Sequence, residues 1–250
     1  MQREYYIHKM QDEAYKQYCD SMLFEEDLQK VYEEIDWKMK QPDFLGKTVK
    51  VTKKQFPEVY HIIQKMCDIE QMEYPAVYVY EDYYYGAESY GMEKPWIELS
   101  AKTIQDFTRE ELQFVLAREI YKILDGVTKQ KTLLEEYFKI LRQIAPAKLE
   151  KVSKLSFYHW YRLANYSADN YGYLMCGSIK SSIDAVLMLV LNSRLLVQQV
   201  NVKEFINQAS EINKLDDMVF NYTKADESVP YAPYRIQNLL AYAVWVQKRI

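Results

Sequence analysis

Apolar residues recur at helical spacing in the charged N-terminal stretch of the chain. Between residues 12 and 40 these positions are Leu23, Leu28, Val31 and Ile35. Steps of three or four residues place side chains on one face of a helix, so we expect a helical N-terminal arm. Pro42 and Gly46 are suited to end it. The pattern divides the chain into this arm over residues 1–45 and a domain over residues 46–250.

The pattern from residue 57 to residue 99 predicts one helix and then strands. Pro57 suits the first turn of a helix over 58–67, where a missing amide donor costs little. Residues 76–80 read AVYVY, and such β-branched and aromatic runs favour a strand. Residues 83–91 predict a turn or a second short strand, and residues 96–99 predict another strand.

Beyond residue 107 the pattern predicts helices alone. Residues 108–111 read TREE, a capping box in which the Thr hydroxyl and the Glu carboxylate satisfy free amides at a helix start. This helix runs to about Leu124, and Gly126 is suited to end it. Further helices are expected over 131–144, 157–176 and 179–199, and after the Pro-rich stretch 229–233. The expected fold is α+β and mostly helical, with one small sheet.

The composition is that of a globular protein and gives no electrostatic case for nucleic-acid binding. Hydrophobic residues make up 49% of the 250 residues, and charged residues make up 27%. The net charge is −4, whereas phosphate recognition needs a clustered basic surface. Cys19, Cys67 and Cys176 form no CxxC pair, so we expect reduced thiols and a cytoplasmic location.

The best candidate for a membrane span is the stretch over residues 183–200. Asp184, Asn192 and Arg194 interrupt it, and a spanning helix needs roughly 20 predominantly apolar residues. We therefore expect a buried core helix and no membrane span. The first residues of the chain also lack the apolar core of a signal peptide.

The helix after the capping box carries the residues of greatest interest. One stripe of this helix contains Leu112, Leu116, Glu119, Ile120 and Ile123. Arg118 and Lys122 are four residues apart and share a face beside that stripe. From periodicity alone, the simplest interpretation is an amphipathic helix with a solvated basic edge.

Motifs in a fixed order change that interpretation. Residues 111–122 read ELQFVLAREIYK and follow a strand that ends in a small polar residue, and residues 160–169 read WYRLANYSAD. Residues 86–91 read GAESYG, and Pro230 precedes Arg235 and Ile236 downstream. Together these segments resemble the HtpX-like zinc metallopeptidases, which are gluzincins. The family's segments read NAxxxG, ELxxVLAHExxH, WxRxxExxAD and HPxxxxRI, and the resemblance extends from about residue 48 to the C-terminus.

The resemblance implies a zincin-type fold, but no zinc-ligand position keeps a residue suited to hold the metal. The family's two motif histidines fall on Arg118 and Lys122, its glutamate ligand falls on Asn165, and the histidine of its HP motif falls on Val229. A guanidinium has no lone pair, an ammonium is protonated at neutral pH, and an asparagine oxygen is a weak, uncharged ligand. Zinc is the cofactor expected for the family, and we expect this chain to bind neither zinc nor another cofactor.

Two acidic residues of the family pattern remain, Glu119 at the general-base position and Asp169 on the later helix. Without a metal they would lose their counter-charge, and an unpaired buried carboxylate is costly. Arg118 and Lys122 supply two positive charges nearby. We hypothesise that an ion-pair cluster of these four side chains replaces the metal site.

The resemblance also places a substrate cleft along the strand near residue 87. It assigns Gly86, Ala87 and Tyr90 to this cleft, together with Arg235. The surrounding tyrosines are Tyr78, Tyr80, Tyr83, Tyr84, Tyr85 and Tyr90. Their simplest interpretation is aromatic packing on a strand. The functional interpretation is a groove that binds an extended peptide by strand addition.

Three functions remain open from the sequence. The first is a catalytically inactive pseudo-peptidase that binds a peptide or protein partner in the former cleft. The second is an active metallopeptidase with non-standard ligands that uses Glu119 and Asp169. The third is a structural assembly subunit whose arm makes the contact and whose cleft is filled.

Overall fold

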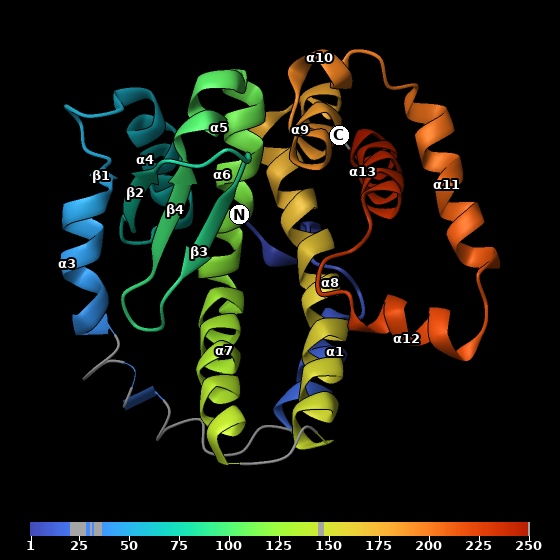
Figure 1. Ribbon diagram of the computed structural model, residues 1–250. Helices are drawn as coiled ribbons and strands as arrows, with labels where there is room; N and C mark the ends of the chain where they lie inside the picture. The colour runs from blue at the N-terminus through green and yellow to red at the C-terminus, as the bar shows by residue number, and fades with distance from the viewer. Residues whose placement is uncertain (21–28, 31, 33–36, 145–147, 250) are drawn as a thin grey trace.

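The computed structural model describes residues 1–20, 29–30, 32, 37–144 and 148–249. Helices dominate, and one small sheet lies in the first half of the chain, which confirms the α+β, mostly helical class (Figure 1). The elements before residue 107 are the 3₁₀ turn η1 (Arg3–Tyr5), α1 (Gln11–Cys19), α3 (Trp37–Lys47), β1 (Val49–Lys50), α4 (Pro57–Glu70), β2 (Ala76–Tyr80), β3 (Ala87–Tyr90), β4 (Trp96–Ser100) and α5 (Ala101–Asp106). The later elements are α6 (Arg109–Leu124), α7 (Val127–Ile144), α8 (Lys148–Cys176), α9 (Ile179–Leu191), α10 (Arg194–Val197), α11 (Val202–Lys214), α12 (Met218–Asp226) and α13 (Ala232–Gln247).

The sheet has four strands in the order β1-β2-β4-β3, so β1 and β3 form its edges. β2 runs parallel to β4, and β3 runs antiparallel to β4 with Ser89 opposite Ile97. β2 coincides with the strand predicted over 76–80. Its three central residues are all buried, so both of its faces are covered. β4 confirms the strand predicted over 96–99, and β3 shows that the segment 83–91, predicted as a turn or a short strand, contains a strand.

α6 is the central helix of the fold. Its predicted capping box is present, because Thr108 and Glu111 exchange hydrogen bonds between side chains and amides. Figure 1 shows the sheet on one side of α6 and α8 and α9 on the other, which buries almost every residue from 111 to 122. Gly172 lets α8 approach α6 closely, since a Cβ there would lie 2.8 Å from the ring of Phe114.

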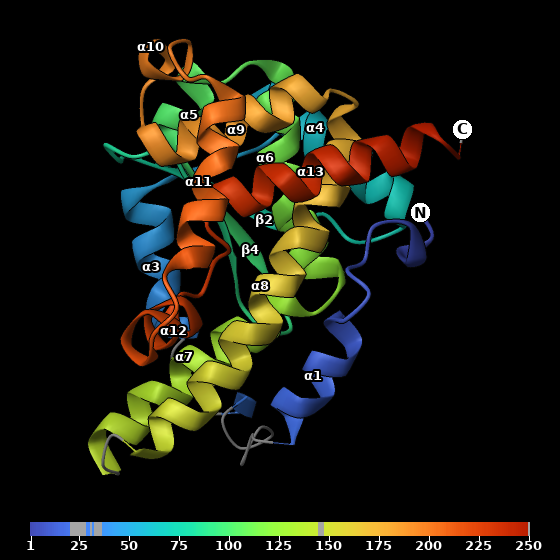
Figure 2. The same ribbon diagram turned by 90° about the vertical axis from the view of Figure 1, so that its right-hand side faces the viewer.

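The C-terminal half departs most from the prediction. The pattern predicts one helix over 179–199, but α9 ends at Leu191 because Asn192 adopts a left-handed φ of 50°. The Asn192 side chain accepts a hydrogen bond from the amide of Tyr85 and donates one to the carbonyl of Tyr83. α11 and α12 are additional helices, and Figure 2 shows α13 crossing the fold where it packs on α8, α9 and α11. Within the described residues, no helix combines the length and apolar character that crossing a membrane requires.

The described residues of the predicted N-terminal arm pack against the rest of the chain. α1 lies along α8, and the ring of Tyr18 is buried and stacked on Trp160. Gln11 is buried as well, and the hydroxyl of Tyr121 on α6 donates to it at 3.0 Å. α3 continues through Pro42 to Lys47, beyond the predicted end. The division at residue 45 stays a prediction. The predicted apolar positions outside the described residues are Leu23, Leu28, Val31 and Ile35.

Candidate functional site

α6 brings three candidate residues into the interior of the protein. Glu119 is fully buried, and Arg118 and Lys122 are each only 6% exposed. The interpretation of these two cations as a solvated edge is therefore wrong, because α8 and the rest of the fold cover that face of α6. Buried cations need partners in the interior, since an unpaired buried charge is costly.

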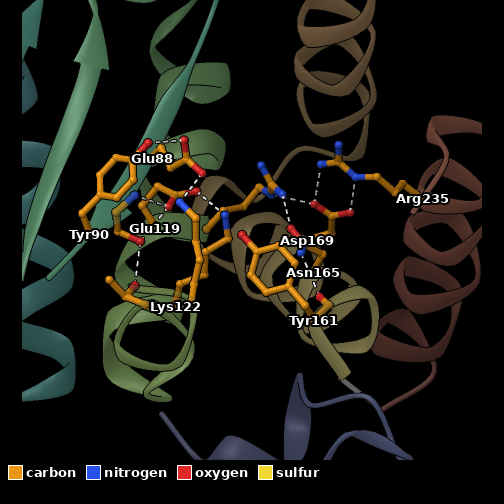
Figure 3. A network of polar contacts seen from close by, with 12 residues as sticks. Glu88, Tyr90, Glu119, Lys122, Tyr161, Asn165, Asp169 and Arg235 are labelled. Carbon is orange, nitrogen blue, oxygen red and sulfur yellow. Dashed lines mark hydrogen bonds and ion pairs between the residues drawn. The ribbon is translucent and has the colours of Figure 1, made fainter. Parts of the chain in front are cut away.

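The carboxylate of Glu119 is held from two sides. Its Oε2 accepts hydrogen bonds from the amide and the hydroxyl of Ser89 on β3, both at 2.8 Å. Its Oε1 accepts a hydrogen bond from Lys122 Nζ at 2.7 Å. The Ser89 hydroxyl also lies 2.7 Å from Thr128 Oγ1, which extends the contact to α7. Both carboxylate oxygens are thus engaged by the protein itself (Figure 3).

Asp169 of α8 lies between two arginines. Arg235 of α13 donates from Nε to Oδ2 and from Nη2 to Oδ1, each at 2.8 Å, in a bidentate fork. Arg118 Nε lies 2.7 Å from Oδ1 in an ion pair that lacks the alignment of a hydrogen bond. Arg118 Nη2 donates to Asn165 Oδ1 at 3.0 Å, and Asn165 Nδ2 donates to the carbonyl of Tyr161 at 2.8 Å.

These contacts form a buried arrangement that we call the charge network. Its members are Arg118, Glu119, Lys122, Asn165, Asp169 and Arg235. The four side chains of the hypothesised cluster form two ion pairs, Arg118 with Asp169 and Lys122 with Glu119, each at 2.7 Å. Arg235, which the resemblance assigns to the cleft, is 6% exposed and donates to Asp169.

The charges in this network favour the ionised form of Asp169. Burial alone would raise the pKa of Asp169, but the positive charges of Arg235 and Arg118 outweigh it and hold the pKa below its ordinary value. Burial opposes the charge of Arg235, but Asp169 outweighs it and raises the pKa of that guanidinium. Burial, together with the charge of Arg235, lowers the pKa of Arg118. Three cations face two carboxylates, so the network carries one excess positive charge.

The residues present do not fit a zinc ion. Within the described part of the chain, no three His, Cys, Asp or Glu side chains lie together as metal ligands would. The positions that the motif resemblance aligns with zinc-binding histidines hold Arg118 and Lys122, which are hydrogen-bond donors without a lone pair. The oxygen of Asn165 already accepts from Arg118. We therefore assign no metal-dependent step to Glu119.

Side chains of the protein cap one backbone amide of the predicted cleft strand, β3, and the amide of the residue that follows it. The amide of Ser89 donates to Glu119, and the amide of Gly91 donates to Thr132 Oγ1 at 3.0 Å. Both partners come from helices that pack against β3, namely α6 and α7. A peptide adds to a sheet edge through free backbone groups, so these two donors are closed to strand addition.

The other residues assigned to the cleft have separate environments. Gly86 precedes β3 and its amide donates to Thr103 Oγ1 at 2.8 Å, whereas Ala87 is half-buried against the core. The hydroxyl of Tyr90 donates to Glu88 at 2.6 Å.

The tyrosines around β3 do not share one surface. Tyr78 and Tyr85 are buried, while Tyr83 and Tyr84 are 82% and 69% exposed. Tyr78 stacks on Phe44 with ring centres 5.1 Å apart. Aromatic packing therefore accounts for the buried members of this group.

A cavity of about 270 Å³, which we call the cleft cavity, is lined by Tyr161, whose carbonyl accepts a hydrogen bond from Asn165 of the charge network. Its walls include Glu88 of β3, Val229, and four rings from α7 and α8, namely Phe138, Phe157, Tyr158 and Tyr161. Lys131 pairs with Glu88, and its Nζ lies 4.0 Å from the centre of the Tyr90 ring. Burial alone would raise the pKa of Glu88, but the charge of Lys131 outweighs it and lowers that pKa.

Sequence reasoning missed the hydroxyl groups that complete the site. Ser89, Thr128 and Thr132 belong to no motif, and their partners lie 30 to 41 residues away along the chain. The sequence held one weak indication for Ser89. It lies two residues after Ala87, which was assigned to the cleft, and side chains two residues apart share one face of a strand. The aromatic walls of the cleft cavity were missed because they come from two helices whose relative position the sequence does not encode locally.

Comparison with known proteins adds no family to this picture. The chain matches no protein-family model, and a search of curated proteins finds no match. The interpretation of the site therefore rests on its geometry and on the resemblance of its motifs.

Proposed function

We propose that this chain is a metallopeptidase-like protein without zinc chemistry, which binds a segment of a partner protein beside the former catalytic helix. The observation that carries the proposal is the occupation of the family's ligand positions by internally paired side chains. Arg118 and Lys122 pair with Asp169 and Glu119, at 2.7 Å in each case. A zincin-like fold is part of the same proposal, and the course of edge strand β3 alongside α6 supports it.

The cleft cavity is the binding site that we propose for the partner. It combines aromatic walls with the charged groups Glu88, Lys131 and Glu135, and such a mixture of apolar surface and a few polar groups is typical of binding pockets. Because the amides of Ser89 and Gly91 are capped, the partner is bound through side chains inserted into the cavity. Strand addition, which the sequence suggested as the binding mode, plays no part at these two positions.

Metal analysis of the purified protein tests the loss of zinc chemistry. The natural chain should contain no stoichiometric zinc, and the triple variant Arg118→His, Lys122→His, Asn165→Glu should take zinc up if it folds. Circular dichroism checks the fold of the variant, because all three positions are buried. Zinc bound in equal amount to the natural chain would overturn the proposal whether or not the variant folds.

A peptide-display selection followed by fluorescence polarisation tests the binding site. Tyr158→Ala removes one wall of the cleft cavity and should weaken binding of a selected peptide by about tenfold or more, as for a contact at the centre of an interface. Tyr84→Ala is the matched control, because Tyr84 is 69% exposed and does not line this cavity. Equal affinities of the two variants would place binding elsewhere.

A structural role is the second candidate, and one observation favours it. Glu119, Asp169 and Asn165 are all essentially inaccessible, so the charge network forms part of the core and is not an open site. If this role is the correct one, display selection yields no peptide whose binding depends on Tyr158. Substitutions in the charge network then change the free energy of unfolding alone.

A further inference from the structure

A second cavity, of about 300 Å³, lies between α8, α12 and the start of α13. We call it the Arg162 cavity. Its apolar and aromatic lining includes Leu163, Tyr166, Val229, Pro230 and Tyr231. Val229 is the one described lining residue that it shares with the cleft cavity. Neither the charge network nor the proposed partner-binding site uses this space.

Arg162 is a half-buried guanidinium at this cavity, and no described carboxylate forms an ion pair with it. Its Nη1 donates to the main-chain carbonyls of Ala225 and Glu227. Its Nε and Nη2 have no hydrogen-bond acceptor within the described residues, and no carboxylate there lies at ion-pair distance. Burial lowers the pKa of Arg162 and outweighs the opposing effect of nearby groups, among them the Glu227 carboxylate.

Other arginines of this protein that are shielded from solvent form an ion pair with a carboxylate. Arg118 and Arg235 pair with Asp169, and Arg194 pairs with Glu111. Arg162 differs because its hydrogen bonds to described residues go from Nη1 to main-chain carbonyls, which leaves Nε and Nη2 on the other side of the guanidinium available, and the Glu227 carboxylate acts on it without an ion-pair contact. A guanidinium fork matches the geometry of a carboxylate and binds it through two parallel hydrogen bonds.

The other charged residues that line the Arg162 cavity also favour the binding of an anion. Lys224 lines it and donates from Nζ to the carbonyl of Leu215 at 2.7 Å, which adds a second cation. Glu227 is the one acid among the described lining residues. Two cations against one carboxylate leave an excess positive charge beside a largely apolar surface.

We propose that the Arg162 cavity binds a small organic anion, namely a carboxylate attached to an apolar chain or ring. The carboxylate accepts hydrogen bonds from Nε and Nη2 of Arg162. The apolar part lies against Leu163, Pro230 and Tyr231. A cavity of about 300 Å³ is at the small end of the range for ligand sites, which restricts the ligand to a small molecule.

A matched series of six-carbon ligands tests the proposal on the full chain. Hexanoate, 1-hexanol and hexylammonium share one apolar body and differ in charge. Titration of nitrogen-15-labelled protein, read at the Arg162 side-chain resonance, should give a Kd on the order of 1 mM for hexanoate. Hexanoate should bind at least about tenfold more tightly than the other two, because it alone forms charge-assisted hydrogen bonds.

Three variants locate the site. Arg162→Met should weaken hexanoate binding by about tenfold or more, whereas Arg109→Met should leave it unchanged because the Arg109 side chain is 65% exposed on α6. Glu227→Gln keeps the main-chain carbonyl that Arg162 uses and removes the nearby negative charge. Glu227→Gln should tighten hexanoate binding roughly threefold. If Arg162→Met does not fold, this variant alone tests whether hexanoate binds in the Arg162 cavity. Equal binding of hexanoate and hexanol, or weaker binding by Glu227→Gln, would overturn the proposal.

Discussion

Replacement of Asp169 by Asn should destabilise this protein strongly. Asn has nearly the same shape as Asp but carries no charge, so Arg118 and Arg235 would lose their shared counter-ion in the interior. Two hydrogen bonds at 2.8 Å and one ion pair at 2.7 Å depend on that charge. Removing one partner of a buried ion pair costs about 3–5 kcal/mol, a large part of the roughly 5–15 kcal/mol that stabilises a typical domain.

Urea denaturation of the natural chain and the variant measures this difference. The two curves should differ in midpoint at an unchanged slope, since a changed slope would mean a different unfolded or native state. Asp43→Asn is the matched control, because Asp43 pairs with Lys47 while their side chains are 66% and 73% exposed. An exposed pair contributes about 0–1 kcal/mol. If Asp169→Asn cost no more than Asp43→Asn, the charge network would not stabilise the fold in the way inferred from its geometry.

Three further outcomes follow from particular residues. The folded-state pKa of Asp169 lies below its ordinary value of 3.8, so its pairing stabilises the fold above about pH 4. This stabilisation is lost as the pH falls lower. Urea denaturation at pH 7 and at pH 3 should therefore show a smaller difference in free energy of unfolding between the natural chain and Asp169→Asn at the lower pH. Gly172→Ala should cost about 1–3 kcal/mol in urea denaturation because its Cβ would meet Phe114, whereas Gly46→Ala, with nothing within 4 Å, should change stability by less than about 1 kcal/mol. Asn192→Ala should lower the thermal midpoint by removing about 1–2 kcal/mol of hydrogen bonding and left-handed backbone preference, and an unchanged midpoint would contradict that role.

Local signals explain which parts of the fold the sequence predicts well. The capping box at residues 108–111 and the strand at residues 76–80 depend on neighbours along the chain, and both appear as predicted. The end of α9 depends instead on Asn192, whose side chain bonds to the loop around Tyr83 and Tyr85 more than a hundred residues away. No periodicity in the segment 179–199 carries that information.

In the candidate site, too, local spacing predicts some contacts, whereas contacts between distant segments escape prediction. Spacing on one helix places Arg118, Glu119 and Lys122 together, and the motif resemblance brings Asp169 to them. The role of Arg235 was missed because its fork on Asp169 joins residues that are 66 positions apart. The pairing of Glu119 with Ser89 was missed because it depends on how β3 packs against α6.

The capped amides of Ser89 and Gly91, in β3 and directly after it, affect the tendency of the chain to associate with itself. An edge strand with unpaired backbone donors is a template on which a second chain can form a sheet, and proteins protect such edges from this association. Here a carboxylate and a hydroxyl, from Glu119 and Thr132, occupy the amides of Ser89 and Gly91. The opposite edge, β1, is only two residues long and contains Lys50, which limits pairing there. Because Ser89 and Glu119 are buried, loss of the Glu119 side chain would leave the Ser89 amide without this acceptor in the interior, and the edge would meet a second chain only if α6 or α7 moved away from β3.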